Sequence, residues 1–205
     1  VVERDLIEAK HWYEKAAEQN DLDAMQKLAY IYVVGESVAP NYEKASKLSE
    51  EPLKKDMAVA QYVKAFLCEN GFYERKQPKV AEQYYIKSAE QGFEPAKEPA
   101  ALAQYKRSGQ IDELLKLKTI KRGKTNYILG TEYINGTLVK KNVKKGLNYL
   151  TAAASQGSSE AYLALGKLYK EGKQVKRNNR KAQNYFKDAA ALGNKEAEQY
   201  LQSNK

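Results

Sequence analysis

The stretch AYLALGKLYKEG at residues 161–172 decides the fold, because the chain repeats it. Residues 24–35 read AMQKLAYIYVVG and residues 125–136 read TNYILGTEYING, with leucine fifth, tyrosine ninth and glycine last in all three. Fainter copies begin at Ala60 and Ala96, and a last one begins at Ala197. Within each half of the chain the copies start 36 residues apart, so we predict a repeat protein with units of 36 residues.

A second recurring element precedes each copy. It reads AKHWYEKAAEQN at residues 9–20, AEQYYIKSAEQG at 81–92, GLNYLTAAASQG at 146–157 and AQNYFKDAAALG at 182–193. Apolar residues fall at i, i+3, i+4, i+7 and i+8, which is helical spacing, and glycine stands where a helix would end. Each unit is therefore predicted to be helix, tight turn, helix and loop.

A single helix pair cannot bury its apolar face alone, whereas stacked pairs share one core. The pattern predicts an all-α fold, an α/α superhelix or solenoid of about twelve helices in five to six repeats. We expect one solenoid over residues 1–205. The step from Ala96 to Thr125 is only 29 residues, so a shortened, degenerate unit is expected at about 96–124.

The pattern at residues 9–20, followed by Ala24, Leu28, Tyr32 and Gly35, resembles the Sel-one-like repeat, a relative of the tetratricopeptide repeat. Residues 153–175 resemble that family more closely still. The resemblance implies an adaptor that binds other proteins. Val2 and Asp5 resemble the end of a loop that closes a preceding unit, so the chain is expected to begin inside a repeat.

The composition excludes several classes of chemistry. The single cysteine forbids an internal disulfide, and the single histidine excludes a histidine-rich metal site and argues against a histidine-dependent triad. There is no glycine-rich phosphate loop and no apolar run long enough to span a membrane. We therefore expect no enzyme activity, no cofactor, no metal and no membrane span.

Charge is unevenly distributed along the chain. Residues 1–102 carry 14 basic and 18 acidic residues, a net charge of −4, whereas residues 103–205 carry 21 and 8, a net charge of +13. Such asymmetry indicates an acidic partner surface, an anionic polymer or head-to-tail contact between copies.

The repeat places the C-terminal cations in register. Lys140, Lys141, Lys144 and Lys145 form a first rung, and 36 residues later Lys176, Arg177, Arg180 and Lys181 form a second rung. Equivalent positions of a solenoid stack on one edge, about 10 Å apart. We call these eight residues the basic edge and predict that they bind a partner, although solvated lysine remains the simpler interpretation. Lys121, Arg122 and Lys124 are expected on the opposite edge.

A second, weaker contact surface is predicted on the concave wall formed by the first helix of each pair. One member of each aromatic pair, Trp12-Tyr13 and Tyr84-Tyr85, should face the core and the other could reach this wall; we assign Tyr13 and Tyr85 to it. Cys68 takes the position of the repeated tyrosine and is expected in the core.

Three functions stay open at this point. The first is a general adaptor that binds a partner protein with an acidic surface. The second, implied by the resemblance, is an immunity protein against a secreted antibacterial effector such as a lipase. The third is a periplasmic scaffold for envelope or exopolysaccharide machinery, or a binder of nucleic acid or anionic polysaccharide. The lysine-, asparagine- and tyrosine-rich composition suggests a bacterial origin, and the resemblance favours the periplasm or envelope over the cytoplasm.

Overall fold

The computed structural model describes residues 2–35, 38–117 and 123–202, with side chains from Ile7 onward. This part of the chain holds twelve α-helices and no strand, as the repeat pattern predicts. The helices are α1 (Val2–Glu18), α2 (Leu22–Val34), α3 (Tyr42–Lys54), α4 (Ala58–Asn70), α5 (Pro78–Glu90), α6 (Glu94–Ser108), α7 (Asp112–Lys116), α8 (Gly123–Asn135), α9 (Val143–Ser155), α10 (Ser159–Glu171), α11 (Asn179–Ala191) and α12 (Lys195–Gln202).

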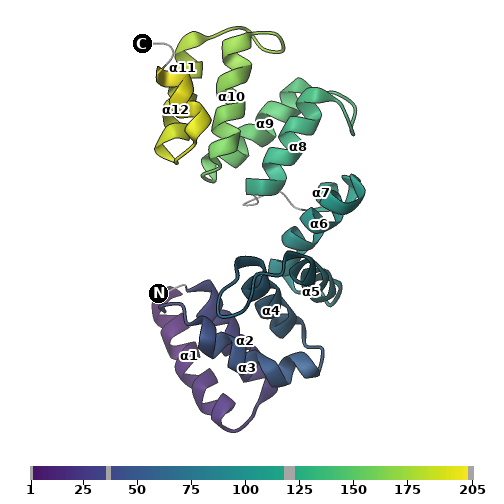
Figure 1. Cartoon of the computed structure of the whole chain (residues 1–205), viewed down its shortest axis with the longest axis vertical. Helices are drawn as coiled ribbons and strands as arrows, with labels where there is room; N and C mark the ends of the chain where they lie inside the picture. The colour runs from purple at the N-terminus through teal and green to yellow at the C-terminus, as the bar shows by residue number, and fades with distance from the viewer. Residues whose placement is uncertain (1, 36–37, 118–122, 203–205) are drawn as a thin grey trace. The chain divides into compact units, whose positions relative to one another are not determined.

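The chain divides into two compact units, residues 1–107 and 108–205 (Figure 1). Consecutive helices from α1 to α5 and from α7 to α12 pack on each other, in the manner of an α-solenoid. The boundary falls inside the segment predicted to be degenerate. There α7, in the first-helix position before α8, has only five residues, whereas the first helices α3, α5, α9 and α11 have thirteen. The continuity of one solenoid across residues 1–205 stays a prediction.

A seven-residue loop joins a second helix to the next first helix over residues 71–77, 136–142 and 172–178. The glycine at its start adopts the left-handed conformation, with φ of +70° at Gly172. An asparagine at its end caps α9 and α11, whereas Gln77 makes no side-chain cap for α5; Asn178 Oδ1, for example, accepts a hydrogen bond from Lys181 N–H at 2.9 Å. The Asn178 N–H in turn donates to the Tyr169 carbonyl at 2.9 Å, so the loop is fixed at both ends.

The core alternates small and large residues across each helix pair. In the second unit, a Cβ atom at Gly166 of α10 would lie 2.5 Å from the Phe186 ring of α11. The equivalent Gly130 of α8 faces Leu150 of α9 in the same way, at 2.7 Å. Both large side chains are buried, so the glycines permit the close helix approach on which the core depends.

No helix in residues 2–35, 38–117 and 123–202 is long and apolar enough to cross a membrane.

Candidate functional site

The basic edge lies entirely in the second unit, on the α8–α9 and α10–α11 loops and the first turns of α9 and α11. Figure 1 shows both loops on the same side of this unit. All eight side chains are exposed. None forms an ion pair with a carboxylate of the described residues, and the whole unit carries 19 basic and 8 acidic residues.

Two of the eight cations pack against tyrosine rings. Lys145 Nζ donates a hydrogen bond to Tyr133 Oη at 2.7 Å and lies 4.3 Å from the ring centroid, while Lys181 Nζ lies 5.2 Å from the centroid of Tyr169. The hydrogen bond from Lys145 to Tyr133 raises the pKa of the lysine. In the first unit Lys44 covers Tyr32 in the same way, at 5.6 Å. These lysines therefore cover tyrosine rings of the helix stack.

Two further cations lie over the loop glycines. The Cβ atoms of Lys141 and Arg177 sit so close to Gly136 and Gly172 that added Cβ atoms would approach them to 2.8 and 2.6 Å. The Arg177 side chain is also oriented, because its Nε donates a hydrogen bond to Asn179 Oδ1 at 3.1 Å.

The remaining four cations are Lys140, Lys144, Lys176 and Arg180, and none of them contacts an acceptor or aromatic ring within the described residues. Lys144 and Arg180 occupy the first turns of α9 and α11, where no acidic residue accompanies them. Cations are unfavourable there, because the helix dipole is positive at its N-terminus. The equivalent position of α3 carries Glu43 instead. These four residues form the free part of the basic edge.

The predicted concave wall needs a correction. Tyr85 is only 4% exposed and its hydroxyl donates to Glu69 Oε2 at 2.8 Å, so it belongs to the core of the first unit and cannot contact a partner. Tyr85 faces inward because the opposite residue on α4, Ala65, is small. Tyr13 is half-buried against the core of α2 and lies under Lys27, at 5.6 Å.

The exposed aromatic residue of α1 is Trp12, at 58%, which the sequence analysis did not assign to a surface. Its equivalents Tyr149 and Tyr185 stack on Tyr133 and Tyr169 of the preceding helices, at 5.7 and 5.9 Å between ring centroids. The repeat register was the signal that could have identified Trp12, because it aligns with Tyr149 and Tyr185.

A groove of about 530 Å³ runs between α1 and α3 in the first unit. Leu28 and Tyr32 of α2 form its floor. The Tyr32 hydroxyl donates to Glu14 Oε1 at 3.1 Å, and Lys10 pairs with the same oxygen at 3.1 Å. Burial opposes the charge of Glu14, but these two hydrogen bonds lower its pKa overall. The carboxylate at the groove is therefore already satisfied.

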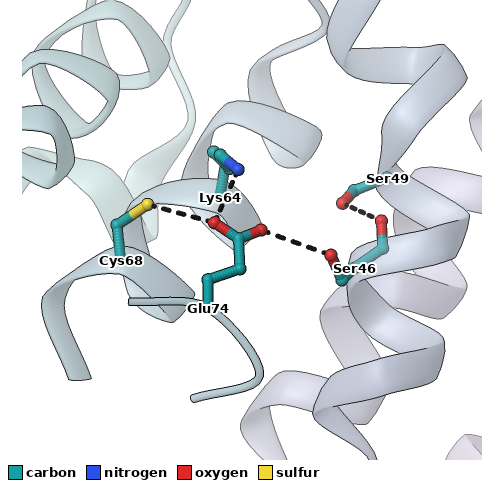
Figure 2. A network of polar contacts seen from close by, with 5 residues as sticks. All are labelled: Ser46, Ser49, Lys64, Cys68 and Glu74. Atoms are coloured by element: carbon teal, nitrogen blue, oxygen red, sulfur yellow. Dashed lines mark hydrogen bonds and ion pairs between the residues drawn. The ribbon is translucent and has the colours of Figure 1, made fainter. Parts of the chain in front are cut away.

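The α4–α5 loop carries a polar cluster that the sequence did not reveal (Figure 2). The Glu74 carboxylate accepts hydrogen bonds from Lys64 Nζ at 2.6 Å, Ser46 Oγ at 3.3 Å and Cys68 Sγ at 3.5 Å. Burial raises the pKa of the Cys68 thiol, and the side chain is fully buried, as predicted. A neutral, inaccessible thiol is a poor nucleophile, so this cluster holds the loop to α3 and α4.

The other predicted cation group lies only partly within the structure. Lys124, at the start of α8, is exposed, while Lys121 and Arg122 lie outside the described residues.

Helix pairs in 36-residue register define a class of protein: the helical repeat scaffold. The particular family follows from comparison with known proteins. Sel1 repeats match residues 2–21, 22–50, 58–93, 124–158 and 159–194, so the chain belongs to the Sel1 repeat family. The segment between residues 93 and 124 lies outside these matches, where the degenerate unit was predicted.

Solved structures agree with this fold. A Sel1 repeat protein from Oxalobacter formigenes is 23% identical, with a TM-score of 0.67 over 98% of this chain and 87% of that one. The protein c5321, a protective antigen of uropathogenic Escherichia coli with an SLR fold, is 22% identical, with a TM-score of 0.64 over 94% of this chain and 43% of that one.

One curated relative shares sequence with part of the chain. It is chitin synthase regulatory factor 3 of Schizosaccharomyces pombe, 38% identical over 88 residues. That match spans 42% of this chain but only 9% of the relative.

Proposed function

We propose that this chain is a scaffold that binds an acidic partner protein along the basic edge of its second unit. Sel1 repeat proteins generally act as protein-interaction scaffolds. The observation that carries the proposal is the free part of the basic edge: four exposed cations, repeated at 36 residues, without a carboxylate partner in the described part of the chain. Unpaired charge of one sign attracts a surface of the opposite sign and speeds its association.

The nature of the surface favours a protein over a nucleic acid. Binders of single-stranded nucleic acid usually stack bases on exposed aromatic side chains. Within the described residues of the second unit, every aromatic side chain is buried or half-buried. The α8–α9 loop instead exposes an apolar side chain, Leu138, at 48%, two residues before Lys140. An apolar group beside cations suits an acidic protein surface with an apolar patch.

The experiment is a capture assay with paired charge reversals. The purified chain serves as bait in nuclease-treated lysate of its own organism, as wild type and as the variant Lys140→Glu/Lys176→Glu. The control is Lys187→Glu/Lys195→Glu, which makes the same charge change at two exposed positions of α11 and α12, outside the basic edge.

We expect one acidic protein, retained in stoichiometric amount by the wild type and the control and lost by the edge variant. Unchanged capture by the edge variant would overturn the proposal. Recovery of polysaccharide alone, lost as salt rises, would replace it with a polyanion-binding function.

A further inference from the structure

The two rungs of the basic edge occupy the same loop positions but carry different cations. Lys141 and Lys144 of the first rung correspond to Arg177 and Arg180 of the second. The ammonium group of lysine is a point charge with freely turning donors. The guanidinium group of arginine is a planar fork with five N–H donors that matches both oxygens of a carboxylate. The second rung therefore has the chemistry for directed recognition.

The Arg177 side chain is oriented by one hydrogen bond. Its Cβ lies over Gly172, where an added Cβ atom would approach it to 2.6 Å, as the Cβ of Lys141 lies over Gly136 in the first rung. Its Nε donates to Asn179 Oδ1 at 3.1 Å, which orients the guanidinium plane. The first rung lacks this hydrogen bond, because Val143 stands where Asn179 does.

This contact leaves the outer end of the guanidinium available. One of its five N–H donors binds Asn179, and no described carboxylate pairs with the other four. A side chain that is already ordered loses less conformational entropy on binding than a free lysine does. Leu138 and the absence of exposed aromatic rings among the described residues of this unit favour an acidic protein segment over a phosphodiester.

We infer that Arg177, oriented by Asn179, is the anchor of the basic edge and binds an aspartate or glutamate carboxylate of the partner through its two terminal nitrogens. The first rung contributes attraction without directed contacts. This inference rests on the proposed function, because it names the residue that gives the same surface its specificity.

The test measures binding of a fluorescein-labelled oligo-glutamate peptide by fluorescence anisotropy, with an oligothymidylate of equal charge as the second probe. Arg177→Lys keeps the charge but removes the fork, and we expect it to weaken peptide binding about tenfold. Asn179→Val, which copies the first rung, should weaken binding severalfold while leaving all cations in place. The matched control is Arg180→Lys, where no orienting contact is present, and it should change the affinity less than twofold.

A spectroscopic readout separates an anchor from a merely structural role. The Nε–Hε resonance of Arg177 should shift on addition of the peptide, while that of Arg180 should move less. Loss of binding in Lys140→Glu/Lys176→Glu without a difference between Arg177→Lys and Arg180→Lys would overturn the inference and leave the proposed function standing. Binding insensitive to that double reversal, or tighter binding of the oligothymidylate, would overturn both.

Discussion

The α4–α5 junction of the first unit and the two junctions of the second unit share one backbone plan but differ in chemistry. In the second unit, Tyr169 stacks on Tyr185 and is covered by Lys181. In the same way, Tyr133 stacks on Tyr149 and is covered by Lys145. At the α4–α5 junction the tyrosine is replaced by Cys68 and the covering lysine by Val80. The difference teaches that these positions change together, since a cation without a ring beneath it would gain nothing there.

The same junction replaces two apolar contacts by an ion pair. Leu129 and Leu165 are buried in the second unit, and Lys64 takes their position in α4. Glu74 takes the position of Val139 and Val175. Lys64 and Glu74 meet at 2.6 Å with side chains only 26% and 19% exposed. This junction therefore fixes its loop with a polar cluster at positions that are apolar in the second unit.

The largest expected effect comes from breaking the packing of the second unit. Phe186→Ala removes a buried ring and should destabilise the protein by about 3–4 kcal/mol, because a cavity remains. Urea unfolding followed by circular dichroism measures the change. Gly166→Ala should destabilise the wild type but cost much less in the Phe186→Ala background, where the space is empty. Additive effects of the two changes would contradict this packing.

Next in size is the conversion of the polar junction into the apolar kind. Lys64→Leu alone should cost about 1–2 kcal/mol, because the half-buried Glu74 carboxylate loses its cation. The double variant Lys64→Leu/Glu74→Val copies the residues of the second unit. It should regain the loss and reach or exceed wild-type stability by up to about 1 kcal/mol, measured as above. A double variant as unstable as the single one would show that apolar residues cannot replace the Lys64–Glu74 pair at this junction.

The ion pair also predicts a pH dependence confined to the first unit. Burial lowers the pKa of Lys64, but the hydrogen bond and charge of Glu74 outweigh it and raise the pKa above 10.5. The stability that this lysine contributes is complete below its unfolded pKa and is lost as pH rises through the folded pKa. The wild type should therefore lose stability relative to the Lys64→Leu/Glu74→Val variant above pH 10.5. Urea midpoints of both proteins on either side of that pH test this, and tyrosine ionisation cancels in the difference. A constant difference would refute it.

The smallest effects distinguish the two kinds of lysine on the basic edge. Lys145→Ala removes the contact with Tyr133 and should cost about 0.5 kcal/mol. Lys144→Ala, one residue earlier, should be neutral or stabilise by about 0.3 kcal/mol, because it removes a cation from a helix N-terminus. Thermal unfolding compares the pair. Equal losses would mean that Lys144 also has a structural contact.

Much of this arrangement could be predicted from the sequence. The 36-residue period, the loop glycines, the burial of Cys68 and the shortened middle segment follow from spacing, because helix pairs in register need small and large residues at fixed offsets. The choice of Tyr85 for the wall was wrong although the register contained the answer. Tyr85 aligns with Leu150 and Phe186, which are large core residues, and neighbouring positions such as Tyr84 differ by 100° around a helix.

The functional surface was less predictable than the fold. Eight cations in register look alike in the sequence, whereas the structure divides them by their contacts with Tyr133, Tyr169 and Asn179. The pairing of Lys64 with Glu74 spans a loop, and no local pattern signals a contact across ten residues.

The seven-residue loop has a consequence for how such a chain evolves. Its first and last positions in the second unit, Gly172 and Asn178 or Gly136 and Asn142, maintain the helix connection, and the residues between them carry cations of the basic edge. Duplication of one 36-residue unit therefore copies the connector and the charges on it together. The duplicated loop places a new set of cations in register with the existing rungs. Each duplication therefore adds one more binding site for a repetitive partner, and affinity can rise through avidity before any single contact improves.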